Sequence, residues 1–99
     1  MKELEGKIAI VTGAGQGVGQ GIAFALSAAG VSVVVAGRTE EKLVQTVETI
    51  ASRGGEAIAV ACNVKNSEDL QHLVSVCVKH FGGLNILVNN AQEVPNGLL

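Results

Sequence analysis

The amino-acid sequence predicts a doubly wound α/β fold, in which a parallel sheet of four strands alternates with three helices. Four short runs rich in Val, Ile and Ala occupy residues 7–12, 31–37, 56–64 and 84–90. The runs are almost continuously apolar, which is typical of strands covered on both faces. Successive runs begin about 25 residues apart, which leaves room for one helix and two short loops. Alternation of this kind gives parallel strands joined by right-handed crossovers.

The segments between the runs predict the three helices, because apolar residues recur in them at three- and four-residue spacing. These residues are Val18, Ile22, Ala25, Leu26 and Ala29 in the first helix, Leu43, Val47 and Ile50 in the second, and Leu70, Leu73, Val74 and Cys77 in the third. We expect Thr39 and Asn66 to be the N-caps of the second and third helices. Glycines at positions 30, 54–55 and 82–83 stand where the helices should end.

The composition indicates one globular domain, which we place at residues 1–99. Apolar residues make up 47% of the chain and charged residues 16%, which excludes a disordered protein. The net charge of −2 offers no basic surface for nucleic acid, and no apolar run has the length of a membrane span. We expect His72 and His80 at the helix surface rather than in a metal site, and Cys62 and Cys77 as buried free thiols. The protein is therefore expected to be cytoplasmic.

A glycine-rich segment, TGAGQGVGQG at residues 12–21, joins the first strand to the first helix. A helix N-terminus offers unpaired N–H groups and a positive dipole end, and glycine lets a phosphate approach them closely. The spacing fits the pattern GxxxGxG, not GxGxxG. Gly13 would make the turn, Gly17 would admit the phosphates, and Gly19 would let the helix pack against the strand. The alternative interpretation is a flexible turn that holds no ligand.

Together with LVNNA at residues 87–91, EGKIAIVTG at 5–13 and AGRTEEKL at 36–43, this segment resembles the short-chain dehydrogenase/reductase family, which has a Rossmann fold. The resemblance covers essentially the whole chain, and it corresponds to the amino-terminal, cofactor-binding part of a truncated family domain. It implies an NAD(P)-dependent oxidoreductase that transfers a hydride between a nicotinamide and a small alcohol or carbonyl substrate.

The end of the second strand indicates which cofactor is bound. A carboxylate at this position binds the ribose of NAD, whereas an arginine accommodates the 2′-phosphate of NADP. The strand ends in Gly37 and Arg38, so we expect NADP, with NAD as the alternative. Arg38 could instead be a solvated cation paired with Glu40 or Glu41. Some NADP-preferring members carry a basic residue in the glycine loop, where this chain has Gln16.

The family resemblance also implies contacts at the ends of the third and fourth strands. The family often has Asp where this chain has Asn63, and the next residue, Val64, would pack on the adenine; a plain loop role for Asn63 is equally open. Asn90 and Ala91 would border the ribose, while Gln92 replaces a usual glycine. The full set of expected cofactor contacts is Gly13, Gly15, Gln16, Gly17, Val18, Gly19, Arg38, Thr39, Asn63, Val64, Asn90 and Ala91.

No catalytic residue can be assigned. In this family a tyrosine, assisted by a lysine four residues later, acts beyond the NNA segment, and this chain contains no tyrosine. We therefore expect the 99-residue chain to be inactive by itself. One alternative is a non-catalytic dinucleotide-binding or interaction module, and another is a different Rossmann enzyme such as a methyltransferase. A sheet without its later strands would expose an edge, so we expect the chain to self-associate as a homo-oligomer.

Overall fold

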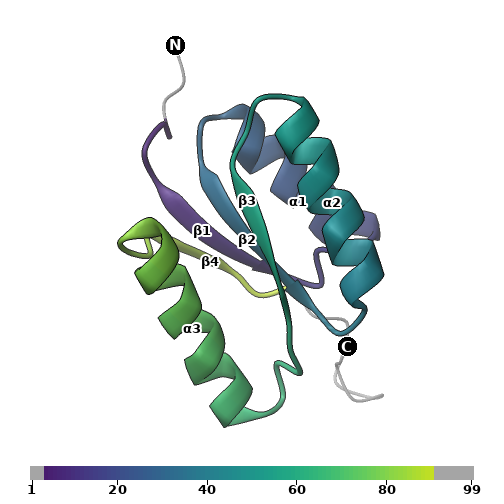
Figure 1. Cartoon of the computed structure of the whole chain (residues 1–99), viewed down its shortest axis with the longest axis vertical. Coiled ribbons are helices and arrows are strands. Elements are labelled where there is room, and N and C mark those ends of the chain that lie inside the picture. The colour runs from purple at the N-terminus through teal and green to yellow at the C-terminus, as the bar shows by residue number, and fades with distance from the viewer. Residues whose placement is uncertain (1–3, 91–99) are drawn as a thin grey trace.

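The computed structural model describes residues 4–90 and confirms the doubly wound α/β fold (Figure 1). The elements in chain order are β1 (Ile8–Thr12), α1 (Gly17–Ala28), β2 (Ser32–Gly37), α2 (Glu40–Ser52), β3 (Ala57–Ala61), α3 (Ser67–Phe81) and β4 (Ile86–Val88). All strand pairs are parallel, and the strand order is β3-β2-β1-β4. Helices α1 and α2 cover one face of the sheet and α3 covers the other.

The strand order reverses its direction of growth at β1. The chain adds β2 and then β3 on one side of β1, and then crosses over to place β4 on the other side. Such a reversal leaves a crevice at the carboxyl ends of the strands, where ligands bind in open α/β sheets. The topology therefore predicts that ligand-binding residues lie in the loops after β1, β2, β3 and β4.

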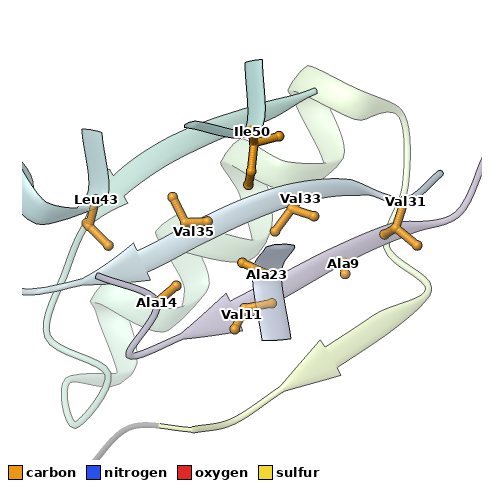
Figure 2. Close-up of a cluster of buried hydrophobic side chains, with 9 residues drawn as sticks. All are labelled: Ala9, Val11, Ala14, Ala23, Val31, Val33, Val35, Leu43 and Ile50. Carbon is orange, nitrogen blue, oxygen red and sulfur yellow. The ribbon is translucent and has the colours of Figure 1, made fainter. Parts of the chain in front are cut away.

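The larger hydrophobic core lies between the sheet and the helices α1 and α2 (Figure 2). Alternate strand residues supply its sheet side, because successive side chains of a strand point to opposite faces. The strand residues are Ala9, Val11, Val33 and Val35, and they meet Ala23 of α1 and Leu43 and Ile50 of α2. The intervening strand residues Ile10, Val34, Ala36 and Val60 form a second core with Leu73 and Cys77 of α3. Burial on both faces explains the continuous apolar runs of β1 and β2. For β4 the prediction of cover on both faces is wrong, because Leu87 is 60% exposed on this edge strand.

The predicted apolar stripe of α1 is partly wrong. The buried residues of this helix are Gly19, Ala23 and Ser27, whereas Val18 is 67% exposed and Ala25 is also exposed. Small residues on the buried side let the backbone of α1 come close to the sheet, and large side chains there would hold the two apart. The stripe of α2 is correct in that Leu43 and Ile50 are buried. In α3, Leu73 and Cys77 are buried, but Leu70 and Val74 remain 38% and 39% exposed.

The helix ends agree with the sequence in most respects. The Asn66 side chain accepts the N–H groups of Glu68 and Asp69 at 2.8 and 3.1 Å, so the predicted cap of α3 is confirmed. Thr39 does stand at the N-cap of α2, but its hydroxyl makes no capping hydrogen bond within the described chain, and that part of the prediction is wrong. Positive φ angles of 95°, 85° and 92° confirm the helix-ending glycines at positions 30, 54 and 82.

Strands β3 and β4 are shorter than predicted. Strand β3 ends at Ala61, so Asn63 lies in the following loop, and β4 comprises only residues 86–88. Asn85 makes two hydrogen bonds that join the start of β4 to β1. Its side-chain oxygen accepts the Ile8 N–H at 2.9 Å, and its backbone N–H donates to the Ile8 carbonyl at 2.9 Å. Among the helices of residues 4–90, none is long and apolar enough to cross a membrane.

Candidate functional site

A cavity of about 430 Å³ opens at the carboxyl ends of the strands. It is lined by the loop after β1, the end of β2 with the first turn of α2, the loop after β3, and the residues after β4. The lining residues are Gly13, Gly15, Gln16, Gly17, Val18, Gly37, Arg38, Thr39, Lys42, Leu43, Cys62, Asn63, Val64 and Asn90. Of the residues expected from the sequence, Gly19 lies behind this surface and Ala91 lies outside the described residues; the structure brings all the others together.

The glycine loop, residues 12–21, needs glycine at two turns. Gly13 and Gly17 have φ angles of 63° and 60°, a left-handed conformation that costs side-chain-bearing residues free energy. Gly17 begins α1, and its N-cap, Gln16, makes no side-chain capping hydrogen bond in the described chain. The first turn of α1 therefore presents N–H groups and the positive end of the helix dipole without a capping side chain of its own. Such a cradle fits an anionic group.

Gly19 permits a close approach of α1 to the end of β1. A Cβ atom at this position would lie 2.0 Å from the Gly13 carbonyl oxygen and 2.8 Å from the Asn90 side-chain nitrogen. Neither separation is sterically possible, so any side chain at residue 19 would displace the loop or the helix. This agrees with the packing role that the sequence predicts for Gly19.

Thr12 joins the ends of β1 and β4. Its side chain is 2% exposed, and its hydroxyl oxygen accepts the backbone N–H of Asn90 at 2.8 Å. The hydroxyl proton is directed toward the side-chain oxygen of Asn89 at 3.2 Å or the Val88 carbonyl at 3.4 Å. The two consecutive asparagines therefore differ: the Asn89 side-chain oxygen is one of two acceptors within reach of the Thr12 hydroxyl, and Asn90 lines the cavity. We missed this role of Thr12 because a single threonine at a strand end carries no distinctive sequence signal.

A second threonine, Thr46 of α2, supports the glycine loop from behind. It is fully buried, and its hydroxyl lies 3.0 Å from the Ala14 carbonyl and 3.1 Å from the Lys42 carbonyl, either of which can accept its proton. The same hydroxyl accepts a hydrogen bond from the Gln20 side chain at 3.1 Å. Helix α2 thus fixes the position of the loop and of α1 together. Sequence reasoning did not identify Thr46.

Two cationic residues line the cavity near β2. Arg38 follows the last residue of β2, as predicted, and is exposed. Lys42, in the first turn of α2, was not predicted; its ammonium group donates a hydrogen bond to the side-chain oxygen of Gln16 in the glycine loop. The sequence does not predict this contact, because it depends on how closely α2 packs on the glycine loop.

The loop after β3 is held by its own polar groups. The backbone N–H of Asn63 donates to the Asp69 carboxylate at 2.7 Å, and the Asn63 side-chain oxygen accepts the Lys65 N–H at 3.0 Å. Of the two interpretations of Asn63, the structure shows the loop role directly. The Asn63 and Val64 residues still line the cavity.

Both cysteines are buried free thiols, as predicted. Burial raises the pKa of the Cys62 thiol, with a further increase from the Asp69 charge and a partly opposing hydrogen bond with Gly37. Burial likewise raises the pKa of Cys77, whose thiol donates to the Gly83 carbonyl at 3.4 Å. Such thiols stay protonated at neutral pH and are poor nucleophiles. Within residues 4–90 no three His, Cys, Asp or Glu side chains are placed to share a metal ion.

Comparisons with known proteins agree on one family. The family model described as short chain dehydrogenase matches residues 7–96. Tropinone reductase-like 3 of Erythroxylum coca is 36% identical over 95 residues, and the 7alpha-hydroxysteroid dehydrogenase of Escherichia coli is 40% identical over 88 residues. These matches cover 96% and 89% of the present chain, but only 37% and 34% of those proteins. The chain thus spans about a third of the length of such relatives.

Solved structures give the same result. The crystal structure of a hydroxysteroid dehydrogenase from Escherichia coli matches with a TM-score of 0.87 and 36% identity, over 93% of this chain and 42% of the other. A variant of the actinorhodin polyketide ketoreductase, solved with NADPH, matches with a TM-score of 0.82 and 38% identity, over 86% of this chain and 33% of the other.

Proposed function

Because the chain belongs to the short-chain dehydrogenase family, we propose that its cavity binds a nicotinamide dinucleotide with the pyrophosphate over the glycine loop. The observation that carries this proposal is the loop between β1 and α1. It combines left-handed turns at Gly13 and Gly17, a helix N-terminus without a capping side chain, and a glycine at position 19 on which the packing depends. This arrangement suits the close approach of backbone N–H groups to phosphate oxygens.

We propose the remaining contacts from the family resemblance, for residues that line the cavity. The adenine lies by Asn63 and Val64, and the adenosine ribose lies toward Arg38 and Thr39. Asn90, followed by Ala91 outside the described residues, borders the ribose, and the Thr12 bond holds the Asn90 backbone. Gly15, Gln16 and Val18 complete the wall.

We propose NADP(H) rather than NAD(H) as the cofactor. Arg38 offers a planar, permanently charged group at the point where the 2′-phosphate would lie. A structural relative solved with NADPH supports this choice. NAD(H) remains the alternative, because the pyrophosphate contacts are common to both dinucleotides.

The reaction class proposed is hydride transfer between the nicotinamide and a small alcohol or carbonyl compound. Relatives named as reductases and hydroxysteroid dehydrogenases support it. Protonation of the developing alkoxide requires an acid, and this chain has no tyrosine to supply it. We therefore propose that residues 1–99 provide the cofactor-binding part of an oxidoreductase and are inactive by themselves. NADPH-dependent reduction of carbonyl compounds by the purified 99-residue chain would contradict this.

A non-catalytic dinucleotide-binding module is the second candidate, favoured by the same lack of tyrosine. If the chain is such a module, a longer protein that contains it should bind the dinucleotide and show no oxidoreductase activity. The oxidoreductase predicts activity in that longer protein, with a tyrosine and a lysine four residues later in the added segment.

Cofactor binding is tested by titrating NADPH and NADH into the chain and into an Arg38→Ala variant. We expect the wild type to prefer NADPH and the variant to lose about tenfold in NADPH affinity, because one charge-assisted phosphate contact is removed. NADH affinity should change little. Equal affinity for both dinucleotides, unaffected by the substitution, would contradict the phosphate assignment.

A further inference from the structure

We propose that Lys42 is a second cation for the ribose 2′-phosphate of NADP(H), and that Gln16 positions its ammonium group beside the glycine loop. The inference rests on the proposed function, because it assigns a further specificity-determining residue to the same cavity. Unlike Arg38, this lysine lies on α2 and reaches the site from the helix side.

The backbone of the glycine loop leaves room for the lysine. A Cβ atom added to Gly15 would lie only 3.0 Å from the Cβ of Lys42, so the lysine stem runs directly against the loop. Its ammonium group then reaches the side-chain oxygen of Gln16, a residue 26 positions away in the sequence. Lys42 is an exposed residue, but its side chain is bonded to the glycine loop and it lines the cavity.

The bond to Gln16 positions the charge without cancelling it. The amide of Gln16 is neutral, so this bond brings no opposing charge to the ammonium group and uses one of its three N–H donors. The neighbouring carboxylates Glu40 and Glu41 are exposed in the same helical turn and do not line the cavity. The positive charge therefore faces the cavity and the negative charges lie beside it.

The glycine loop itself carries no cation: its residues are TGAGQGVGQG. Lys42 of helix α2 instead brings a positive charge to the loop, beside the side chain of Gln16. A phosphate dianion between Arg38 and Lys42 would receive a planar bidentate donor from one side and a compact ammonium from the other. Two cations that contact a group present only in NADP(H) would raise selectivity over NAD(H), and not affinity alone.

The test is a set of matched variants titrated with NADPH and with NADH, using the full 99-residue chain. Lys42→Gln removes the charge and keeps a good helix former. It should weaken NADPH binding about fivefold to tenfold and NADH binding less than about twofold. Lys42→Arg should keep the preference for NADPH, and the control Lys79→Gln, on the exposed surface of α3, should change neither affinity.

The part played by Gln16 is tested by Gln16→Ala. Because the ammonium group would lose its fixed partner, we expect an NADPH-specific loss of about twofold to threefold. The salt dependence gives an independent measurement: NADPH affinity should fall more steeply with ionic strength in the wild type than in Lys42→Gln.

Four outcomes would overturn all or part of the inference. Unchanged NADPH affinity in Lys42→Gln, or an equal loss for NADPH and NADH, would overturn the role of Lys42 and leave the proposed function intact. An unchanged ratio of affinities in Gln16→Ala would overturn the positioning role of Gln16. Failure of the wild type to bind either dinucleotide would overturn the proposed function together with this inference.

Discussion

At the scale of single residues, short polar and small side chains hold the candidate site in shape. Thr12 bonds to Asn90 across 78 sequence positions, and Gly19 leaves no space for even one carbon atom between α1 and the loop. Thr46 fixes the same loop from α2. None of these residues needs to touch a ligand to control the cavity, because each sets the backbone position of residues that line it.

Replacing Gly19 by alanine should both destabilise the chain and impair dinucleotide binding. The new methyl group would collide with the Gly13 carbonyl, and overpacking of this kind costs about 1–3 kcal/mol. Urea unfolding measures the loss. Gly21→Ala in the same helix is the control: no atom lies within 4 Å of its added carbon, so it should stabilise by about 0.5–1 kcal/mol. Equal effects of the two substitutions would refute the steric argument.

Thr12→Val should reduce the free energy of unfolding by about 1–2 kcal/mol, because it leaves the partly buried N–H of Asn90 without its acceptor. Thr49→Val is a suitable control. Within residues 4–90 the Thr49 hydroxyl bonds to the exposed Gln45 carbonyl one turn earlier in α2, so its loss should cost about 0.5 kcal/mol or less. Chemical denaturation of both variants gives the comparison, and a neutral Thr12→Val would show that the bond between the strands is dispensable.

At the scale of elements, the sequence predicts the strands and α2 well and α1 poorly. Strands buried on both faces give continuous apolar runs, and α2 has large apolar residues on its buried side. Helix α1 buries Gly19, Ala23 and Ser27 instead, which apolar periodicity does not detect. The cavity residues on loops could be expected from motifs and from the family resemblance. Lys42 and Thr46 could not, because their contacts depend on how closely α2 packs on the loop.

The two predicted N-caps offer a direct comparison of elements. Asn66→Ala should destabilise the chain by about 1 kcal/mol, because two backbone N–H groups at the start of α3 lose their acceptor. Thr39→Ala should cost clearly less, because the Thr39 hydroxyl makes no capping bond in the described structure. Thermal unfolding followed by circular dichroism measures both. The reverse order of stabilities would show that the cap assignments are mistaken.

At the scale of the whole molecule, the sheet carries apolar surface near its β4 side. Leu87 of β4 is 60% exposed, and Leu70, Val74 and Val78 of α3 are 38%, 39% and 43% exposed. Leu87 pairs with Ile10, which belongs to the core under α3, so its side chain and that helix lie on the same face of the sheet. Exposed apolar groups on an edge strand, and on a helix over the same face of the sheet, favour association.

We therefore expect the 99-residue chain to self-associate, and Leu87→Lys to weaken that association by placing a charge on the edge strand. Analytical ultracentrifugation over a range of concentrations measures the effect. Val18→Lys is the control, because Val18 is equally exposed but lies at the cavity on α1. A folded monomer at high concentration for the unmodified chain would contradict the expectation.

The position of β4 in the sheet has a consequence for the order of folding. Strands β1, β2 and β3 pair with neighbours about 25 residues away, whereas β1 can pair with β4 only after residues 86–88 have been synthesised. The Thr12 bond to Asn90 forms later still along the nascent chain. During translation, the glycine loop is therefore synthesised early, whereas Asn90, which completes the lining of the cavity, is added last. The cavity can form only when nearly all of the described chain has left the ribosome.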